Sequence, residues 1–313
     1  MKQLILITGF LGSGKTTFLE NILQQSIKKT GVLMNEFGSI SIDTDTIIAN
    51  KVELKELTNG SIFCSCLKEQ FIDGLIELLN VEDIDIIFVE SSGISDPSDI
   101  GKIIDIIKIK DPLLQFDFAG TICIVDGLHF LKTYEKMVSV QRQIKHSHKI
   151  IINKMDLIEK DTYSEIIKTI RNINSKVEII STCHSKISYN ELFPKYFKIE
   201  NEETTNTIST RTKSIILSIE NTEKINIEEL LKMLKDISPH FYRTKGYINI
   251  KDRIFKIDQI NNEVYIQTQD LTLDKIKSIN KIVFLSSRSL QSIKAVTDAA
   301  NKYLNKSGYK ITM

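Results

Sequence analysis

The chain has 313 residues, 42% of them hydrophobic and 26% charged, which is the balance of a globular protein with apolar material for one large or two ordinary domains. Its formal net charge of +1 argues against a strongly basic surface, so we expect no nucleic acid among its partners. No apolar run approaches the roughly 18 residues of a membrane span, and the N-terminus does not resemble a signal peptide. These observations predict a cytoplasmic protein without a membrane partner.

The first 200 residues alternate short β-rich runs with helical patterns. Several of these runs are continuously apolar, which favours strands covered on both faces and hence a parallel sheet. The alternation predicts a doubly wound, mostly parallel α/β domain at residues 1–200. Its expected strands are Gln3–Thr8, Gly31–Asn35, Ile84–Val89, Thr121–Val125, Lys149–Ile152 and Glu178–Ile180, and its expected helices lie near 15–29, 67–80, 98–109, 136–146 and 162–173.

A polar, Thr-rich stretch at 201–213 lacks apolar periodicity and predicts a linker. Beyond it, strands follow one another through short turns, and Asn261-Asn262 suits a hairpin. We therefore expect a second, smaller α+β domain at 214–313. Its expected strands are Ser214–Ile219, Tyr242–Ile250, Ile254–Gln259, Glu263–Gln267 and Lys281–Leu285, and its expected helices are Ile227–Ile237 and Leu290–Leu304.

The segment Gly9–Thr17 reads G-F-L-G-S-G-K-T-T and stands between an expected strand and an expected helix. This is the G-x-x-x-x-G-K-[ST] pattern in the context that a phosphate-binding loop requires, which disfavours a glycine-rich turn without a ligand. Glycines let backbone N–H groups wrap around phosphates, and the helix N-terminus adds positive potential. Lys15 would reach the β and γ phosphates, and the Thr16 hydroxyl would ligate Mg²⁺. The predicted nucleotide contacts here are Gly9, Gly12, Ser13, Gly14, Lys15, Thr16 and Thr17.

A second motif, Asn153-Lys154-Met155-Asp156, follows the expected strand Lys149–Ile152. It matches the N-K-x-D pattern, in which the Asp carboxylate accepts the N1–H and the exocyclic amine of guanine. Adenine offers neither donor in that arrangement and would leave the carboxylate unpaired. The motif therefore predicts GTP as the nucleotide, with Asn153, Lys154 and Asp156 at the base, and Ser181 after the next strand is placed to approach it.

A third motif, Glu90-Ser91-Ser92-Gly93, follows the expected strand Ile84–Val89. An acidic residue at such a strand tip normally holds a water ligand of Mg²⁺, and the following glycine supplies a backbone N–H to the γ phosphate. We therefore expect Glu90 in the magnesium shell and Gly93 at the γ phosphate. Glu36 and Asp43 are further candidates for organising the magnesium shell or the attacking water.

Together these motifs resemble those of the CobW/HypB/UreG group of GTPases, and within it the chain is most similar to the CobW branch. The resemblance implies a P-loop GTPase that acts as a metallochaperone or cofactor-assembly factor, with a CobW-type C-terminal domain. The residues that carry it are Gly9–Thr17, Asn35–Gly38, Ile42-Asp43, Glu56–Gly60, Glu90–Pro97, Val125-Asp126, Gln143-Ile144, Asn153–Leu157 and Arg243–Tyr247.

The chain departs from this family in its cysteines. The family usually carries a C-x-C-C cluster directly after the E-L-x-N-G stretch, where this chain reads Ser61-Ile62-Phe63-Cys64, and a different pair, Cys64 and Cys66, stands there instead. Two thiolates at this spacing suit Zn²⁺ or a similar ion such as Co²⁺, but a tetrahedral site needs two further ligands, from Glu36 or from a partner. The alternative, that both are ordinary thiols, stays open.

Three functional hypotheses follow. In the first, Mg²⁺-dependent GTP hydrolysis times the delivery of a metal or metallocofactor to a client metalloprotein or cofactor-assembly enzyme, with slow turnover raised by a partner or by homodimerisation, since no arginine finger is evident. In the second, the chain is a nucleotide-gated module that remodels a metalloenzyme or corrinoid protein and carries no metal. In the third it is a small-molecule kinase, which the N-K-x-D motif disfavours.

Five residues outside these motifs have side chains that often bind metals. His146 and His148 stand beside the strand Lys149–Ile152, and we interpret them as structural or surface residues. Cys123 falls inside an apolar strand and is expected to be buried. For Cys183 and the neighbouring His184 we expect packing rather than ligation.

Overall fold

The structure, a computed structural model, describes residues 1–26, 28–34, 52–56, 68–199, 203–205, 213–260, 263–269, 279–286, 289–305 and 307–312. These residues divide into two compact units, one within residues 1–205 and one within residues 213–312. Most of the linker expected at 201–213 lies outside the described residues, so the domain boundaries stay a prediction. No helix in the described ranges is long and apolar enough to cross a membrane.

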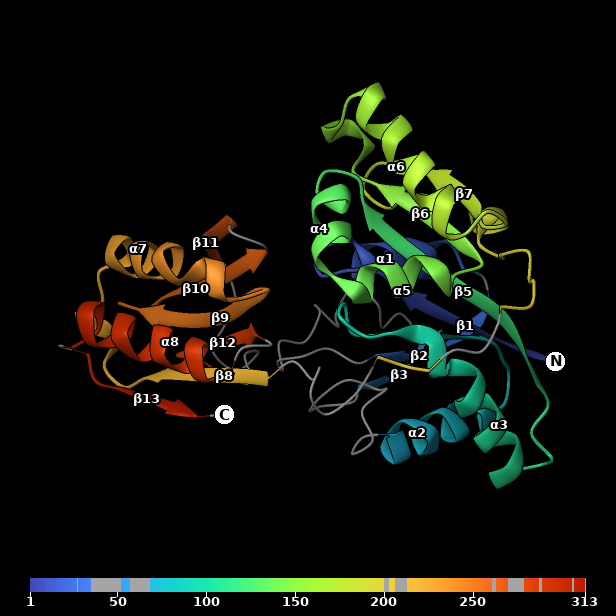
Figure 1. Ribbon diagram of the computed structural model, residues 1–313. Coiled ribbons are helices and arrows are strands. Elements are labelled where there is room, and N and C mark those ends of the chain that lie inside the picture. Colours follow the sequence, from blue (N-terminus) through green and yellow to red (C-terminus); the bar gives the residue numbers. More distant parts are fainter. Residues whose placement is uncertain are drawn as a thin grey trace. The chain divides into compact units, whose positions relative to one another are not determined.

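The first unit is built on a seven-stranded sheet in the order β3-β2-β4-β1-β5-β6-β7, and all its strand pairs are parallel (Figure 1). The chain crosses from β1 to β2 in one direction along the sheet and from β4 to β5 in the other. Because such crossovers are right-handed, helices α1 and α3 cover opposite faces, which is the doubly wound fold expected from the sequence. The strands are β1 (Lys2–Thr8), β2 (Lys29–Met34), β3 (Val52–Glu56), β4 (Ile84–Glu90), β5 (Phe116–Asp126), β6 (Lys149–Asn153) and β7 (Glu178–Ser181).

The core explains why the strand sequences are continuously apolar. On one face, Leu4 and Leu6 of β1 pack in a single cluster with Phe71 and Leu75 of α2 and Ile103 of α3, all fully buried. Alternate residues of β1, such as Ile5, are equally buried, so the sheet is covered on both faces. The helices of this unit are α1 (Lys15–Gln25), α2 (Lys68–Asn80), α3 (Ile100–Lys110), α4 (Phe130–Lys136), α5 (Val138–Lys145) and α6 (Lys160–Ile173).

The structure corrects several expected elements. The helix predicted near 136–146 is α5, and a second, unpredicted helix, α4, precedes it; the two meet at Met137, a residue in extended conformation. Strand β5 begins at Phe116, five residues before the expected Thr121, and passes through Gly120 at a φ of 132°. Strand β3 was not predicted, because its sequence V-E-L-K-E is only five residues long, three of them charged, and it lies at the edge of the sheet.

The second unit is a six-stranded sheet in the order β11-β10-β9-β12-β8-β13, whose strand pairs are antiparallel. Helices α7 (Ile227–Ile237) and α8 (Ser289–Tyr303) pack with it around one apolar cluster that includes Leu230, Phe284 and Val296. This is the smaller α+β unit expected from the hairpin pattern; among the α-helices and strands in its described residues, the last strand was the one not predicted. The strands are β8 (Lys213–Ile219), β9 (Arg243–Ile250), β10 (Arg253–Ile260), β11 (Glu263–Gln269), β12 (Lys281–Ser286) and β13 (Tyr309–Thr312).

Candidate nucleotide site

Five neighbouring strands of the parallel sheet bring the sequence motifs to one edge. Strands β4, β1, β5, β6 and β7 lie side by side in that order, and their last residues are Glu90, Thr8, Asp126, Asn153 and Ser181. Since all five run in the same direction, these ends lie at the same edge of the sheet. Ligands of doubly wound folds bind outside the carboxyl ends of the strands, so this edge is the candidate site.

The loop from β1 to α1 has a backbone that only glycine adopts easily. Gly9 and Gly14 have φ angles of 136° and 103°. A Cβ on Gly9 would lie 2.2 Å from the carbonyl oxygen of Ile124 in β5, so the loop passes directly against the neighbouring strand. Helix α1 then begins at Lys15 with no side-chain cap and no acidic residue in its first turn. The first N–H groups of a helix have no partner within it, so this helix start is suited to an anion.

Lys15 and Thr16 stand at the start of α1. The Lys15 Nζ donates hydrogen bonds to the carbonyl oxygens of Gly9, at 2.9 Å, and Phe10, at 3.2 Å, so the ammonium lies over the loop. The Thr16 Oγ1 lies 3.5 Å from Oε1 of Glu90 at the tip of β4. A hydroxyl and a carboxylate oxygen are hard ligands of the kind that Mg²⁺ prefers. The paired oxygens of Thr16 and Glu90 therefore fit a magnesium ion.

The segment after β4 is held against the phosphate loop. Ser91 N–H donates to the carbonyl oxygen of Ile7 at 2.9 Å, and a Cβ on Gly93 would lie 2.7 Å from the backbone nitrogen of Leu11. The buried Gln143 of α5 donates through Nε2 to the carbonyl oxygens of Gly93 and Ser95, at 3.2 and 3.1 Å. Gln143 is among the residues that carry the family resemblance, but its contacts could not be predicted, because the two acceptors lie about 50 residues away in sequence.

Asp96 joins this segment to two other parts of the chain. Its fully buried carboxylate accepts hydrogen bonds from Ser98 N–H and from Arg142 Nε, both at 3.0 Å, and from the N–H and hydroxyl of Thr205, at 2.8 and 3.0 Å. Burial favours the neutral acid, yet these hydrogen bonds and the Arg142 charge hold the pKa of Asp96 below its ordinary value. Asp96 is therefore an ionised anchor that ties the segment after β4 to Arg142 and Thr205.

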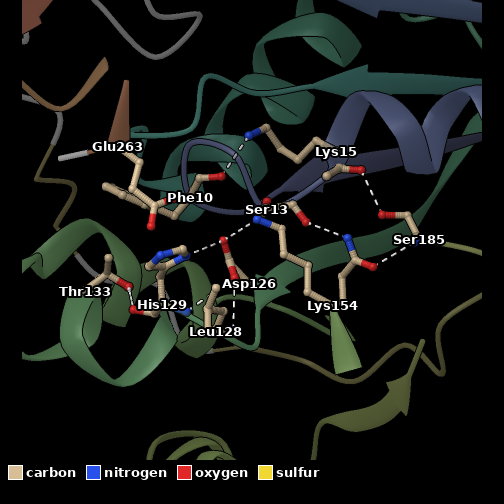
Figure 2. A network of polar contacts seen from close by, with 12 residues as sticks. Phe10, Ser13, Lys15, Asp126, Leu128, His129, Thr133, Lys154, Ser185 and Glu263 are labelled. Carbon is tan, nitrogen blue, oxygen red and sulfur yellow. Dashed lines mark hydrogen bonds and ion pairs between the residues drawn. The ribbon is translucent and has the colours of Figure 1, made fainter. Parts of the chain in front are cut away.

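Asn153, the first residue of N-K-x-D, ties β6 to the phosphate loop. Its Nδ2 donates to the carbonyl oxygen of Ser13 at 2.9 Å, and its Oδ1 accepts from Ser185 N–H at 2.7 Å. The Ser185 hydroxyl in turn donates to the carbonyl oxygen of Gly14 at 3.1 Å (Figure 2). Both polar atoms of the Asn153 amide are thus bonded to protein atoms. Asn153 would therefore contribute to base binding indirectly, by holding the loops that carry Ser13 and Ser185.

Lys154, Asp156 and Ser181 stand at the same edge. Lys154 has a left-handed backbone with a φ of 63°, and its Nζ lies 2.7 Å from Oδ2 of Asp126 (Figure 2). Asp156 follows in a single 3₁₀ turn, Met155–Leu157, where it is exposed and open to a ligand. The hydroxyl of Ser181 donates to the Tyr163 hydroxyl at 2.9 Å.

The transition-metal prediction falls on residues that the structure does not describe. Glu36, Asp43, Cys64 and Cys66 all lie outside the described ranges. Within those ranges, no three His, Cys, Asp or Glu side chains are grouped so as to hold a metal ion. The Zn²⁺ or Co²⁺ site therefore stays a prediction.

The remaining His and Cys residues are placed clearly. His146 and His148 are buried, so of the two interpretations given for them, structural or surface, the structural one is confirmed. Cys123 is buried as expected, and burial raises the pKa of its thiol to about 12. Cys183 and His184 are exposed, so the packing expected for them is wrong.

Comparison with known proteins identifies the family. Residues 3–181 match the model of the CobW/HypB/UreG nucleotide-binding domain. The chain belongs to the CobW/HypB/UreG family. Its CobW/HypB/UreG domain therefore includes the loop at Gly9–Thr17 and most of the carboxyl edge described above, and the resemblance drawn from the motifs is confirmed.

Relatives in this family have names that refer to zinc. The chain is 32% identical over 195 residues to the zinc chaperone YjiA of Escherichia coli (strain K12), a match that covers 60% of this chain and 59% of the relative. It is 30% identical over 194 residues to the zinc-regulated GTPase metalloprotein activator 1 of Schizosaccharomyces pombe, covering 58% and 46%. It is 29% identical over 183 residues to the zinc chaperone CobW of Sinorhizobium sp, covering 49% and 51%. The chain thus spans about half the length of the curated relatives that it matches.

Among solved structures, the zinc-bound YjiA GTPase from E. coli aligns with 96% of this chain and 98% of its own, at 20% identity and a TM-score of 0.48. The nickel complex of HypB from Helicobacter pylori aligns with 58% of this chain and 79% of its own, at 18% identity and a TM-score of 0.43. The family assignment rests on the sequence match.

Proposed function

We propose that the chain binds GTP with Mg²⁺ and hydrolyses it, and that hydrolysis times the delivery of a metal to a client metalloprotein or cofactor-assembly enzyme. The observation that carries the proposal is the meeting of three motifs at one edge of the parallel sheet: the phosphate loop, the Thr16–Glu90 oxygen pair and Asn153–Asp156. The family, whose matched domain is nucleotide-binding, supports the first step. The names of the relatives, which include zinc chaperones and a GTPase metalloprotein activator, support the second.

The roles proposed for the chain's residues follow from their positions. The N–H groups at the start of α1 would bind the phosphates, and Lys15 would exchange its carbonyl acceptors in the loop for β and γ phosphate oxygens. Thr16 and Glu90 would hold Mg²⁺, which supplies positive charge against the phosphates. Gly93, pinned by Gln143, would offer its N–H to the γ phosphate. Hydrolysis would be slow without a client or homodimerisation.

Guanine selection is tested at Asp156. The Asp156→Asn variant should lose affinity for GTP by about 100-fold or more. The carboxylate accepts from two guanine donors, N1–H and the exocyclic amine, whereas the amide presents an N–H donor to one of them. The same variant should gain affinity for xanthosine triphosphate, which has a carbonyl in place of the exocyclic amine. Both affinities are measured by calorimetric titration.

A matched control for this test is Asp161→Asn, an exposed aspartate in the first turn of α6. Asp161→Asn also removes one negative charge, five residues from Asp156 in sequence, and this variant should bind GTP as the wild type does. The guanine assignment fails if Asp156→Asn and Asp161→Asn bind GTP and xanthosine triphosphate alike.

Metal delivery is tested at the two cysteines. We propose Cys64 and Cys66 as ligands of Zn²⁺ or Co²⁺ in the GTP-bound protein, completed by Glu36 or by the client. The double variant Cys64→Ser, Cys66→Ser should lose zinc stoichiometry in the presence of GTP, measured by metal analysis after desalting. Cys183→Ser is the matched control, since Cys183 is an exposed free thiol away from the pair in sequence.

Unchanged zinc and cobalt content in the double variant would favour the second function, a nucleotide-gated module that remodels a metalloenzyme or corrinoid protein and carries no metal. The observation in favour of that alternative is the altered C-x-C-C stretch, in which only Cys64 of the three expected thiols is present.

A further inference from the structure

Beside the phosphate loop, the buried carboxylate of Asp126 contacts two side chains, Lys154 and His129, in pairings that the spacing of the sequence motifs does not reveal. Asp126, the last residue of β5, is 7% exposed, and its Oδ2 lies 2.7 Å from Nζ of Lys154 and 3.1 Å from Nδ1 of His129. Its Oδ1 accepts hydrogen bonds from the N–H groups of Leu128, at 3.0 Å, and His129, at 3.3 Å. The two carboxylate oxygens therefore have different partners. Oδ1 accepts from the backbone of the turn after β5, and Oδ2 contacts the Lys154 ammonium and the His129 ring.

The two strands that carry Asp126 and Lys154, β5 and β6, both contact the phosphate loop. Ile124, two residues before Asp126, contacts Gly9, and Asn153, directly before Lys154, donates to Ser13. Figure 2 shows Asp126, His129 and Lys154 converging beside the loop that carries Ser13. The Asp126–Lys154 ion pair thus links the ends of β5 and β6 next to the phosphate loop, although Asp126 and Lys154 are 28 residues apart in sequence.

Lysine is a flexible side chain whose ordering costs conformational entropy. A partly exposed lysine in the motif that recognises the base would otherwise have to be ordered whenever a nucleotide binds. Burial opposes the ionisation of Asp126, yet the hydrogen bonds from His129 and Lys154 hold its pKa below the ordinary value, so the carboxylate remains charged at neutral pH. A fixed anion at the end of β5 places the Lys154 ammonium before the ligand arrives.

We propose that Asp126 is a positioning residue for guanine nucleotides, which acts by holding Lys154 of N-K-x-D in its binding orientation beside the phosphate loop. This inference rests on the proposed GTP site and extends it to a residue that touches no nucleotide itself. It assigns Asp126 to nucleotide affinity and not to the hydrolytic step, because its contact is with the base-recognition motif and not with the segment around Gly93.

The test variant is Asp126→Asn. The amide keeps a carbonyl oxygen for the turn through Leu128 and His129, and it places an NH₂ group against the Lys154 ammonium. The Kd for GTP and the Kd for GDP should both rise by about tenfold or more. The kcat at saturating GTP should stay within about twofold of the wild type, while KM rises. Calorimetric titration and steady-state kinetics measure these quantities on the full chain.

The double variant separates positioning from general damage. If Asp126 acts through Lys154, then adding Asp126→Asn to Lys154→Met should weaken GTP binding no further, whereas independent effects would multiply. Asp73→Asn is the matched control, because it breaks the exposed pair with Lys110, at 3.0 Å, and should leave the Kd unchanged.

Two results would overturn the inference: a Kd for GTP in Asp126→Asn within about twofold of the wild type, or multiplicative effects in the double variant. A fall in kcat equal to the rise in KM would also contradict it. Wild-type protein that binds no guanine nucleotide would instead refute the proposed function, so the two failures are distinguishable.

Discussion

Acidification should destabilise the first unit through His148. The ring is buried, accepts a hydrogen bond at Nδ1 from Thr121 N–H at 3.0 Å, and pairs at Nε2 with the carbonyl oxygen of Phe197 at 3.0 Å. Tyr196 stacks on it with the ring centroids 4.9 Å apart. These partners require the neutral ring with its proton on Nε2. A second proton, on Nδ1, would face the Thr121 N–H, and the charged ring would be without the hydration it has in the unfolded chain.

The magnitude follows from the pKa. Burial is the largest cause and lowers the pKa of His148 from 6.5 to about 4, with a smaller lowering by His146, although the Phe197 carbonyl opposes it. Between these two values the unfolded chain binds a proton that the folded chain excludes. Stability is therefore fully present above pH 6.5 and falls as the pH drops toward 4. At about 1.4 kcal/mol per pKa unit, the loss approaches roughly 3 kcal/mol.

The assay is urea unfolding followed by far-ultraviolet circular dichroism from pH 7.5 to 4.5, since the chain contains no tryptophan. His148→Asn keeps an acceptor for Thr121 but loses the ring that stacks on Tyr196, so it should be less stable than wild type at pH 7.5. Because asparagine has no proton to gain, that difference should shrink by about 2 to 3 kcal/mol as the pH falls.

The control is His184→Asn, an exposed histidine with a φ of 53°, a conformation that asparagine tolerates. Its stability should run parallel to the wild type at all pH values. If His148→Asn also runs parallel to the wild type, the inferred exclusion of the proton is refuted.

Three further predictions concern close contacts in the two units. Gly14→Ala places a Cβ 2.5 Å from Nδ2 of Asn153 and should weaken GTP binding by about tenfold or more, because the loop must shift; unaltered affinity in a titration would contradict this. Gln143→Ala leaves the carbonyl oxygens of Gly93 and Ser95 without this donor and should lower the free energy of unfolding in urea by about 2 kcal/mol; an unchanged midpoint and slope would count against it. Gly246→Ala places a Cβ 2.4 Å from the carbonyl oxygen of Lys281, so hydrogen exchange in β9 and β12 should accelerate; protection equal to that of the wild type would rule out the clash.

The motifs were predictable because their chemistry is local. A phosphate loop needs consecutive backbone N–H groups, which only a glycine-rich run such as Gly9–Gly14 provides, and the N-K-x-D and Glu90 motifs end apolar strands recognisable from composition. The continuous apolar runs likewise predicted the parallel sheet. The edge strand β3 was not predicted, because it lies at the border of the sheet and its five residues, V-E-L-K-E, include only two apolar ones, too few to distinguish it from a surface segment.

The sequence alone therefore determined the family and the fold class, and it predicted the residues of the phosphate loop. Tertiary structure decided which side chains support them: Asn153 on the loop at Ser13, Gln143 under Gly93, and Asp126 beside Lys154. These pairs stand 28 to 140 residues apart, and they meet only because the strand order sets β4, β1, β5 and β6 side by side. A hydrogen bond or an ion pair depends on proximity in space, which spacing along the chain does not reveal.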